Sequence, residues 1–117
     1  MDRANNRVVH LGLDGKFIGV VAEGLLLPAC VHIHGDWAVI GELRGRVSIL
    51  DRKGNIFAQV GGNDKKDEIG TNRTPPAKWR QGVVTAPHGI TCNAQGDIFV
   101  AEWNITGRVH RFNHVPN

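Results

Sequence analysis

The sequence repeats one short pattern three times, and this repetition limits the available folds more than any other feature of the chain. The pattern is an Arg-Val pair followed by apolar residues, and it begins at Arg7, Arg46 and Arg108. The first two copies lie 39 residues apart, and the hairpin glycines that follow them, Gly15 and Gly54, keep that offset. A period of about 40 residues with short strand-like segments is typical of propellers and solenoids.

A second pattern recurs ahead of the Arg-Val pairs. Pro28 opens a segment that ends at Glu42, and Pro87 opens a matching segment that ends at Glu102. Together the patterns predict a cycle of four strands: one after the proline, one ending at the glutamate, one from Arg-Val and one after a glycine hairpin. The strands are predicted at residues 7–11, 17–21, 30–34, 38–43, 46–50, 56–60, 88–92, 97–102 and 108–112.

This cycle predicts an all-β chain of two to three four-stranded antiparallel blades, fewer than a closed propeller ring needs. Residues 1–23 are expected to form part of a blade, 24–61 a full blade, 62–85 an inserted loop and 86–117 part of another blade. The second strand of each blade is expected to lie buried between its neighbours. The expected core consists of Val8, Val20, Ile33, Val39, Val47, Ile49, Ile56, Ile90, Ile98, Val100 and Val109.

The inserted loop breaks the register of the repeat, because Arg46 and Arg108 are 62 residues apart rather than 39. Its polar, glycine- and proline-containing composition indicates a surface segment, and a loop of this length within a compact domain is often functional. Trp79 lies inside it. This side chain either pins the loop to the sheet surface or serves as an aromatic residue on a binding face.

Composition narrows the range of partners. The net charge is only +3, and the densest cluster of charges, Lys65 and Lys66, is followed directly by Asp67 and Glu68. No basic stripe with interleaved aromatic residues is present, so a nucleic-acid surface is not expected. No apolar run approaches the ~20 residues of a membrane span, and residues 1–6 contain no apolar segment of the kind found in a secretion signal.

Three segments of the chain carry a family resemblance. Residues 86–90 (Ala-Pro-His-Gly-Ile), 96–103 (Gly-Asp-Ile-Phe-Val-Ala-Glu-Trp) and 107–109 (Gly-Arg-Val) resemble the NHL-repeat family of six-bladed β-propellers. In particular, they resemble bacterial propellers related to the lyase domain of peptidylglycine amidating enzymes. The resemblance implies a binding or scaffolding module that takes a protein or a small ligand on the propeller face. It is compatible with export, so the cellular compartment stays open.

A six-bladed ring is larger than this chain, which leaves two interpretations. The chain is a fragment of a larger six-bladed protein, or its copies self-assemble to complete the ring.

The resemblance also implies an alternative function, that of a metal-dependent lyase or hydrolase. In the amidating lyases a zinc ion in the central channel is held by histidines from several blades, and His88 fits such a ligand in its Pro-His-Gly setting. Against this interpretation, the equivalent position of the preceding repeat is Ala29, and the chain has no tyrosine to act as a base near the metal. His88 would otherwise bind backbone groups at the channel mouth. Whether the parent protein is an enzyme therefore stays open.

The remaining candidate residues are weaker. His32 and His34 are two residues apart and share one strand face, which is a possible metal-binding pair without an adjacent third ligand. The recurring glutamates and arginines, Glu42 with Arg46 and Glu102 with Arg108, are expected to form ion pairs between strands two and three. The two cysteines of the chain are expected to be small, buried side chains.

Overall fold

The computed structural model describes residues 1–116, and its regular structure is almost entirely β. Two 3-10 turns, η1 (Arg3–Asn5) and η2 (Pro76–Lys78), are its helical parts. The strands are β1 (Val8–Leu11), β2 (Phe17–Ala22), β3 (Pro28–His34), β4 (Trp37–Glu42), β5 (Arg46–Leu50), β6 (Ile56–Val60), β7 (Pro87–Cys92), β8 (Ile98–Glu102) and β9 (Val109–Phe112). The prediction of an all-β chain is confirmed, and the predicted strands agree with these bounds to within two residues.

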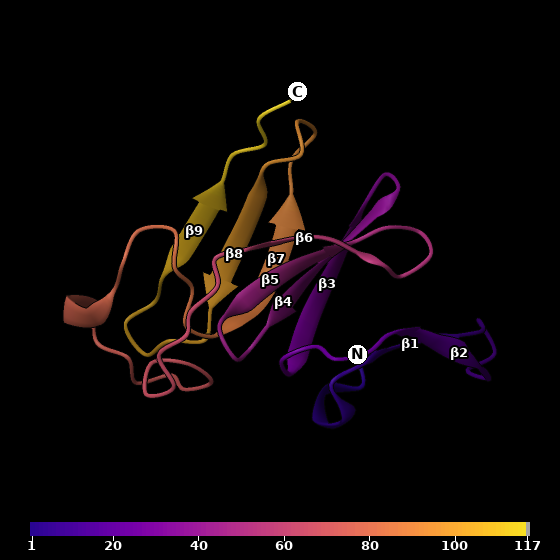
Figure 1. The fold of residues 1–117 in the computed structure, drawn as a ribbon, viewed down its shortest axis with the longest axis horizontal. Helices are drawn as coiled ribbons and strands as arrows, with labels where there is room; N and C mark the ends of the chain where they lie inside the picture. The colour runs from indigo at the N-terminus through magenta and orange to yellow at the C-terminus, as the bar shows by residue number, and fades with distance from the viewer. Residues whose placement is uncertain (117) are drawn as a thin grey trace.

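The strands form three antiparallel sheets, each with its strands in sequence order. We call them the N-terminal hairpin (β1–β2), the central sheet (β3–β6) and the C-terminal sheet (β7–β9). Figure 1 shows the central and C-terminal sheets side by side, with the indigo hairpin at the other side of the central sheet. Among residues 1–116, no helix has the length and apolar character needed to cross a membrane.

Glycine at position 54 serves both the turn and the packing. Gly54 has a φ of +85°, the left-handed backbone region that the β5–β6 hairpin uses and that favours glycine. A Cβ at this position would lie 1.9 Å from the carbonyl oxygen of Val21 in β2. The repeated hairpin glycine therefore also allows the N-terminal hairpin to approach the central sheet closely.

The central sheet has an apolar core on each of its faces, because successive residues of β4 point in opposite directions. Ile40 packs on the side of the N-terminal hairpin, and Val39 packs on the side of the C-terminal sheet. The first core contains Ala22, Leu25, Ile40 and Leu50, with Val8 and Ala38 packed against it. The second contains Val39, Val47, Ile98 and Val100, with Ile49, Val60, Ile90, Cys92 and Phe112 packed against it.

Both junctions between sheets use equivalent residues. Val8 and Val47 are the valines of the first two Arg-Val pairs, and each packs against the sheet that follows its own. At the first junction Val8 contacts the cluster of Ile40 in β4, and at the second Val47 contacts the cluster of Val100 in β8. Ile40 and Val100 are also equivalent, since each lies two residues before the recurring glutamate. The repeats therefore stack twice with the same pair of faces.

Part of the expected core was wrong. Val39, Val47, Ile98 and Val100 are buried, and Val8, Ile49 and Ile90 are partly buried. The exposed members are Val20, Ile33, Ile56 and Val109. All four lie on β2, β3, β6 or β9, each of which has a neighbouring strand on one side only. An apolar residue on such an edge is covered on fewer sides than one in β4 or β8, whose burial between neighbours is confirmed.

Candidate functional site

The two recurring glutamates are buried acceptors at the ends of β4 and β8. Glu42 is 0% exposed and accepts hydrogen bonds from the backbone N–H of Leu26 (2.6 Å) and from Nη2 of Arg46 (2.8 Å). The hydroxyl of Ser48 donates to its other oxygen. The predicted ion pair with Arg46 is confirmed. The backbone donor, however, belongs to the segment that precedes β3, so Glu42 joins that segment to β5.

Glu102 has the same role in the C-terminal sheet with a different partner on the third strand. It accepts hydrogen bonds from the backbone N–H (2.6 Å) and the hydroxyl (2.5 Å) of Thr85, and from Nε2 of His110 (3.0 Å). His110 takes the place of Ser48, because each pairs with the residue two positions before the glutamate. Burial raises the pKa of Glu102, but these hydrogen bonds outweigh it and hold the pKa below its ordinary value.

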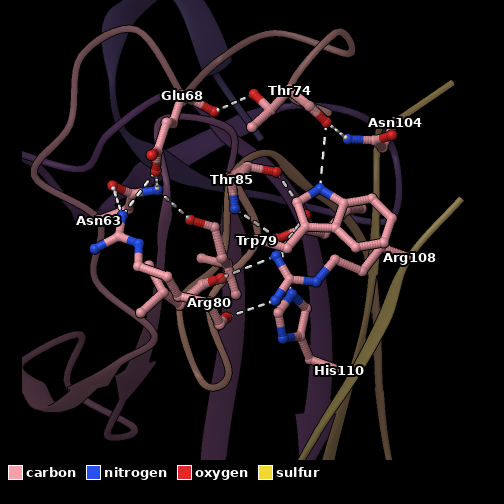
Figure 2. A network of polar contacts seen from close by, with 12 residues as sticks. Asn63, Glu68, Thr74, Trp79, Arg80, Thr85, Asn104, Arg108 and His110 are labelled. Atoms are coloured by element: carbon pink, nitrogen blue, oxygen red, sulfur yellow. Dashed lines mark hydrogen bonds and ion pairs between the residues drawn. The ribbon is translucent and has the colours of Figure 1, made fainter. Parts of the chain in front are cut away.

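Arg108 forms the expected ion pair with Glu102 only at long range, and its hydrogen bonds hold the inserted loop. Its nearest approach to Glu102 is 4.0 Å, whereas its Nη2 donates to the carbonyl of Arg80 (2.6 Å) and its Nη1 to the carbonyl of Val83 (3.2 Å). Its guanidinium lies 5.0 Å from the centre of the Trp79 ring, a cation–π contact. Figure 2 shows the guanidinium between this ring and the loop backbone.

Trp79 is half-buried, and its indole N–H donates to the carbonyl of Thr74 (3.2 Å). The same carbonyl accepts from Nδ2 of Asn104 (2.9 Å) in the turn after β8. These contacts fasten the loop to the C-terminal sheet (Figure 2). The alternative role of Trp79 as a binding-face aromatic stays a prediction.

A third buried carboxylate, Glu68, organises the other half of the loop. It accepts from Nδ2 of Asn63 (3.1 Å) and from Nη2 of Arg80 (2.7 Å), and these two contacts lower its pKa. Within residues 1–116, Nε of Arg80 is the one buried side-chain polar atom without a hydrogen-bond partner. Glu68 and Glu102 thus both act as structural acceptors at the loop, while Trp79, Asn104 and Arg108 donate to carbonyls of its backbone.

A feature suited to a ligand lies between the central and C-terminal sheets, near the β3–β4 and β7–β8 hairpin turns. It is a cavity with a volume of about 420 Å³ that opens to solvent. Its walls are mostly apolar, with two imidazoles, a thiol and an amide among them. The lining residues are His34, Trp37, Val39, Ile49, Phe57, Cys92, Ala94, Gln95, Gly96, Ile98 and His114.

Aromatic rings form one wall of this cavity. The rings of Trp37 and Phe57 have their centres 4.6 Å apart and are tilted by 42°. On the same wall, His34 is half-buried at the end of β3. Phe57 is 68% exposed and Trp37 is 36% exposed, so this wall presents an apolar surface to a flat ligand.

The buried carboxylate of Asp97 holds the opposite wall in place. Asp97 accepts from the backbone N–H of His114 (2.8 Å), from Nδ2 of Asn93 (3.0 Å) and from Nη2 of Arg111 (2.7 Å). These contacts lower its pKa from 3.8 to about 2. Nδ1 of His114 lies 3.0 Å from the carbonyl oxygen of Gln95. The imidazole of His114 is thereby held at the cavity, and burial raises the pKa of the Cys92 thiol beside it.

The predicted site residues are not gathered in one place. His34 lines the cavity, His32 lies on the same face of β3 without lining it, and His88 is exposed at the start of β7. In the described residues, no group of three or more His, Cys, Asp or Glu side chains could hold a metal ion. Metal binding by His88, His32 or His34 stays a prediction, and so does the alternative of a lyase or hydrolase.

Sequence reasoning missed the other cavity residues that carry polar or aromatic groups: Trp37, Phe57, Cys92, Gln95 and His114. The sequence did contain one signal for this cavity, the Gly-Asp turn that recurs in the β3–β4 and β7–β8 hairpins. Trp37 directly follows the first of these turns, and Gly96 belongs to the second. Equivalent turns of stacked repeats lie side by side.

Comparison with protein-family models and with curated proteins finds no match for this chain. The resemblance to the NHL-repeat family therefore stays a prediction from the residues quoted from the sequence.

Proposed function

We propose that this chain is part of a β-propeller of NHL type and acts as a binding or scaffolding module, with the cavity between the central and C-terminal sheets as its ligand site. The propeller is supported by the two junctions, which stack equivalent faces of successive repeats. A non-catalytic role is supported by the hydrogen bonding of the Glu42 and Glu102 carboxylates. Their oxygens are taken up by fixed backbone and side-chain donors rather than turned toward the cavity.

The cavity itself is the observation that carries the binding role. Its volume of about 420 Å³ lies within the range of small-molecule sites, roughly 300–1,000 Å³. Apolar walls with a few polar groups are the usual composition of such sites. The tilted rings of Trp37 and Phe57 suit a flat aromatic group, while His34 and His114 on opposite walls suit an acidic substituent. The ligand class is therefore an aromatic compound that carries an acid group.

The anilinonaphthalene sulfonate dye ANS has this chemistry and serves as the probe. Its fluorescence is measured with the folded chain, and far-UV and near-UV circular dichroism monitor the fold. In the Cys30→Ser chain, N-ethylmaleimide can react only with Cys92, at the cavity wall. We expect this adduct to weaken dye binding by at least about tenfold.

The matched control is the Cys92→Ser chain, in which the reagent can reach only Cys30. Cys30 is half-buried like Cys92 but does not line the cavity, so its adduct should leave dye binding unchanged. Equal dye binding in the two treated chains, or no binding to the folded wild type, would remove the cavity as a ligand site.

A further inference from the structure

The C-terminal sheet leaves one of its faces uncovered. Val100 and His110 point toward the central sheet, so their neighbours on β8 and β9 point away from it. Val109 is 70% exposed there, and the guanidinium of Arg111 lies 5.5 Å from the centre of the Phe99 ring. We call this surface the outer face. It consists of Phe99, Ala101, Val109 and Arg111.

The same positions are covered in the central sheet. Counting from the recurring glutamates and Arg-Val pairs, the equivalents of the outer face are Val39, Gly41, Val47 and Ile49. Val39 and Val47 are buried against the C-terminal sheet. A Cβ on Gly41 would lie 3.3 Å from Cβ of Pro87 in β7, so this position also faces that sheet. The outer face therefore repeats a surface that another sheet covers elsewhere in the chain.

The N-terminal hairpin leaves the complementary face uncovered. Val8 points toward the central sheet, and the next residue, Val9, pairs across the strands with Val20. Leu11 pairs with Phe17, and these two side chains are 51% and 62% exposed. We call Val9, Leu11, Phe17 and Val20 the hairpin face. The equivalent of Leu11 in the central sheet is Leu50, which is buried at the junction with the hairpin.

The outer face and the hairpin face are thus the two halves of a junction that already occurs twice in the chain. Each internal junction joins two kinds of face. One carries the valine of an Arg-Val pair, and the other carries the leucine or phenylalanine that lies four residues after the arginine of such a pair. These are Val8 with Leu50 and Val47 with Phe112. The outer face carries Val109 and the hairpin face carries Leu11. A second copy of the chain therefore presents the missing half for each.

We propose that two copies of this chain pair head to tail, with the outer face of each packed on the hairpin face of the other, in a ring of six sheets. The inference rests on the propeller stacking of the proposed function. Such a contact joins different surfaces of the two copies, and it closes when the rotation per sheet completes a ring. Two copies give six sheets, within the four to eight of known propellers, whereas three copies would exceed that range.

The chain exposes more surface than a compact monomer of its mass, and the excess matches the area that one partner buries in a protein interface. The chain has a solvent-accessible surface of 7137 Å², whereas a compact monomer of its mass of 12.8 kDa exposes about 6,300 Å². The excess of about 850 Å² is close to the roughly 800 Å² that each partner contributes to a standard protein interface.

The test is the mass of the full chain in solution, measured by analytical ultracentrifugation at about 100 µM, a concentration that populates even modest affinities. The wild type is expected at twice 12.8 kDa. Val109→Lys and Leu11→Lys each place a charge in both junctions and should raise the dissociation constant at least about 100-fold. Ile105→Lys is the matched control, since Ile105 is 72% exposed in the β8–β9 turn and lies outside the outer face.

Mixing the two variants separates a broken junction from a broken fold. A pair of one Val109→Lys chain and one Leu11→Lys chain has one junction with both lysines and one with neither. Recovery of paired chains in the mixture, above the level of either variant alone, supports head-to-tail packing and shows that both variants are folded. A monomeric wild type, a trimer or an open series of copies would overturn the proposal. So would equal effects of Val109→Lys and Ile105→Lys. A monomer that still binds ANS at the cavity would leave the proposed function standing.

Discussion

Replacing Glu42 by glutamine removes the charge from the acceptor that joins the segment before β3 to strand β5. The amide retains one oxygen, but its NH₂ group must then face one of the donors that now point at the carboxylate: the backbone N–H of Leu26, the hydroxyl of Ser48 or the guanidinium of Arg46. Because Glu42 is fully buried, water cannot take over the lost hydrogen bonds.

The size of the effect follows from these contacts. A buried donor without a partner costs about 1–3 kcal/mol, and breaking a buried ion pair by removing one partner costs about 3–5 kcal/mol. The Arg46 side chain is 21% exposed, so water satisfies part of the lost ion pair, and the lower end applies. We expect Glu42→Gln to lower the free energy of unfolding by about 3 kcal/mol. Arg46→Met should cost at least as much, about 3–5 kcal/mol, since it leaves the fully buried carboxylate of Glu42 without a cation.

Urea denaturation followed by tryptophan fluorescence and far-UV circular dichroism measures these differences. Glu23→Gln is the control, because Glu23 is exposed and its replacement should change stability by no more than about 0.5 kcal/mol. The reasoning is refuted if Glu42→Gln costs less than about 1 kcal/mol, or if Arg46→Met costs clearly less than Glu42→Gln.

Two further perturbations test other parts of the fold. Gly54→Ala should cost at least about 2 kcal/mol in urea denaturation, because it combines a positive φ with a close approach to Val21, whereas Gly15→Ala, with a similar φ of +82° and open space, should cost about 1 kcal/mol. Asp97→Asn should reduce the loss of unfolding free energy that the wild type shows as the pH falls below 3.8. The native pKa of about 2 lies below the ordinary 3.8, so Asp97 stabilises the fold fully above pH 3.8 and loses that contribution as the pH falls toward 2. Equal acid limbs for the wild type and Asp97→Asn would contradict this role.

The strands and their order could be predicted from the sequence because local chemistry fixes them. Gly15 and Gly54 supply the positive φ that the hairpins need, and both positions adopt it. Pro28 and Pro87 mark the start of the first strand in each repeat, which begins at those residues. The Glu42–Arg46 pair was also predictable, since cross-strand charges next to one turn lie close together.

Contacts between sheets could not be predicted in the same way. Val109 and His110 are neighbours on β9, and apolar character favoured Val109 for the core. The structure buries His110, because Glu102 accepts a hydrogen bond from its imidazole. The cavity combines His34 of β3 with Cys92 of β7 and His114 after β9. These positions are far apart in the sequence, and only the packing of two sheets brings them to one cavity.

The two cores of the central sheet also indicate how the chain should open. Backbone amides of β4 and β5 are covered on both faces, so their exchange with deuterium requires both neighbouring sheets to separate. Within one chain the N-terminal hairpin packs by one face and has two strands, so in the monomer its amides are released by the loss of a single junction. Hydrogen exchange should therefore be slowest in the middle of the chain and fastest at the hairpin. The central sheet would then be the cooperative unit of the fold, and both flanking sheets would stay folded only while the central sheet is folded.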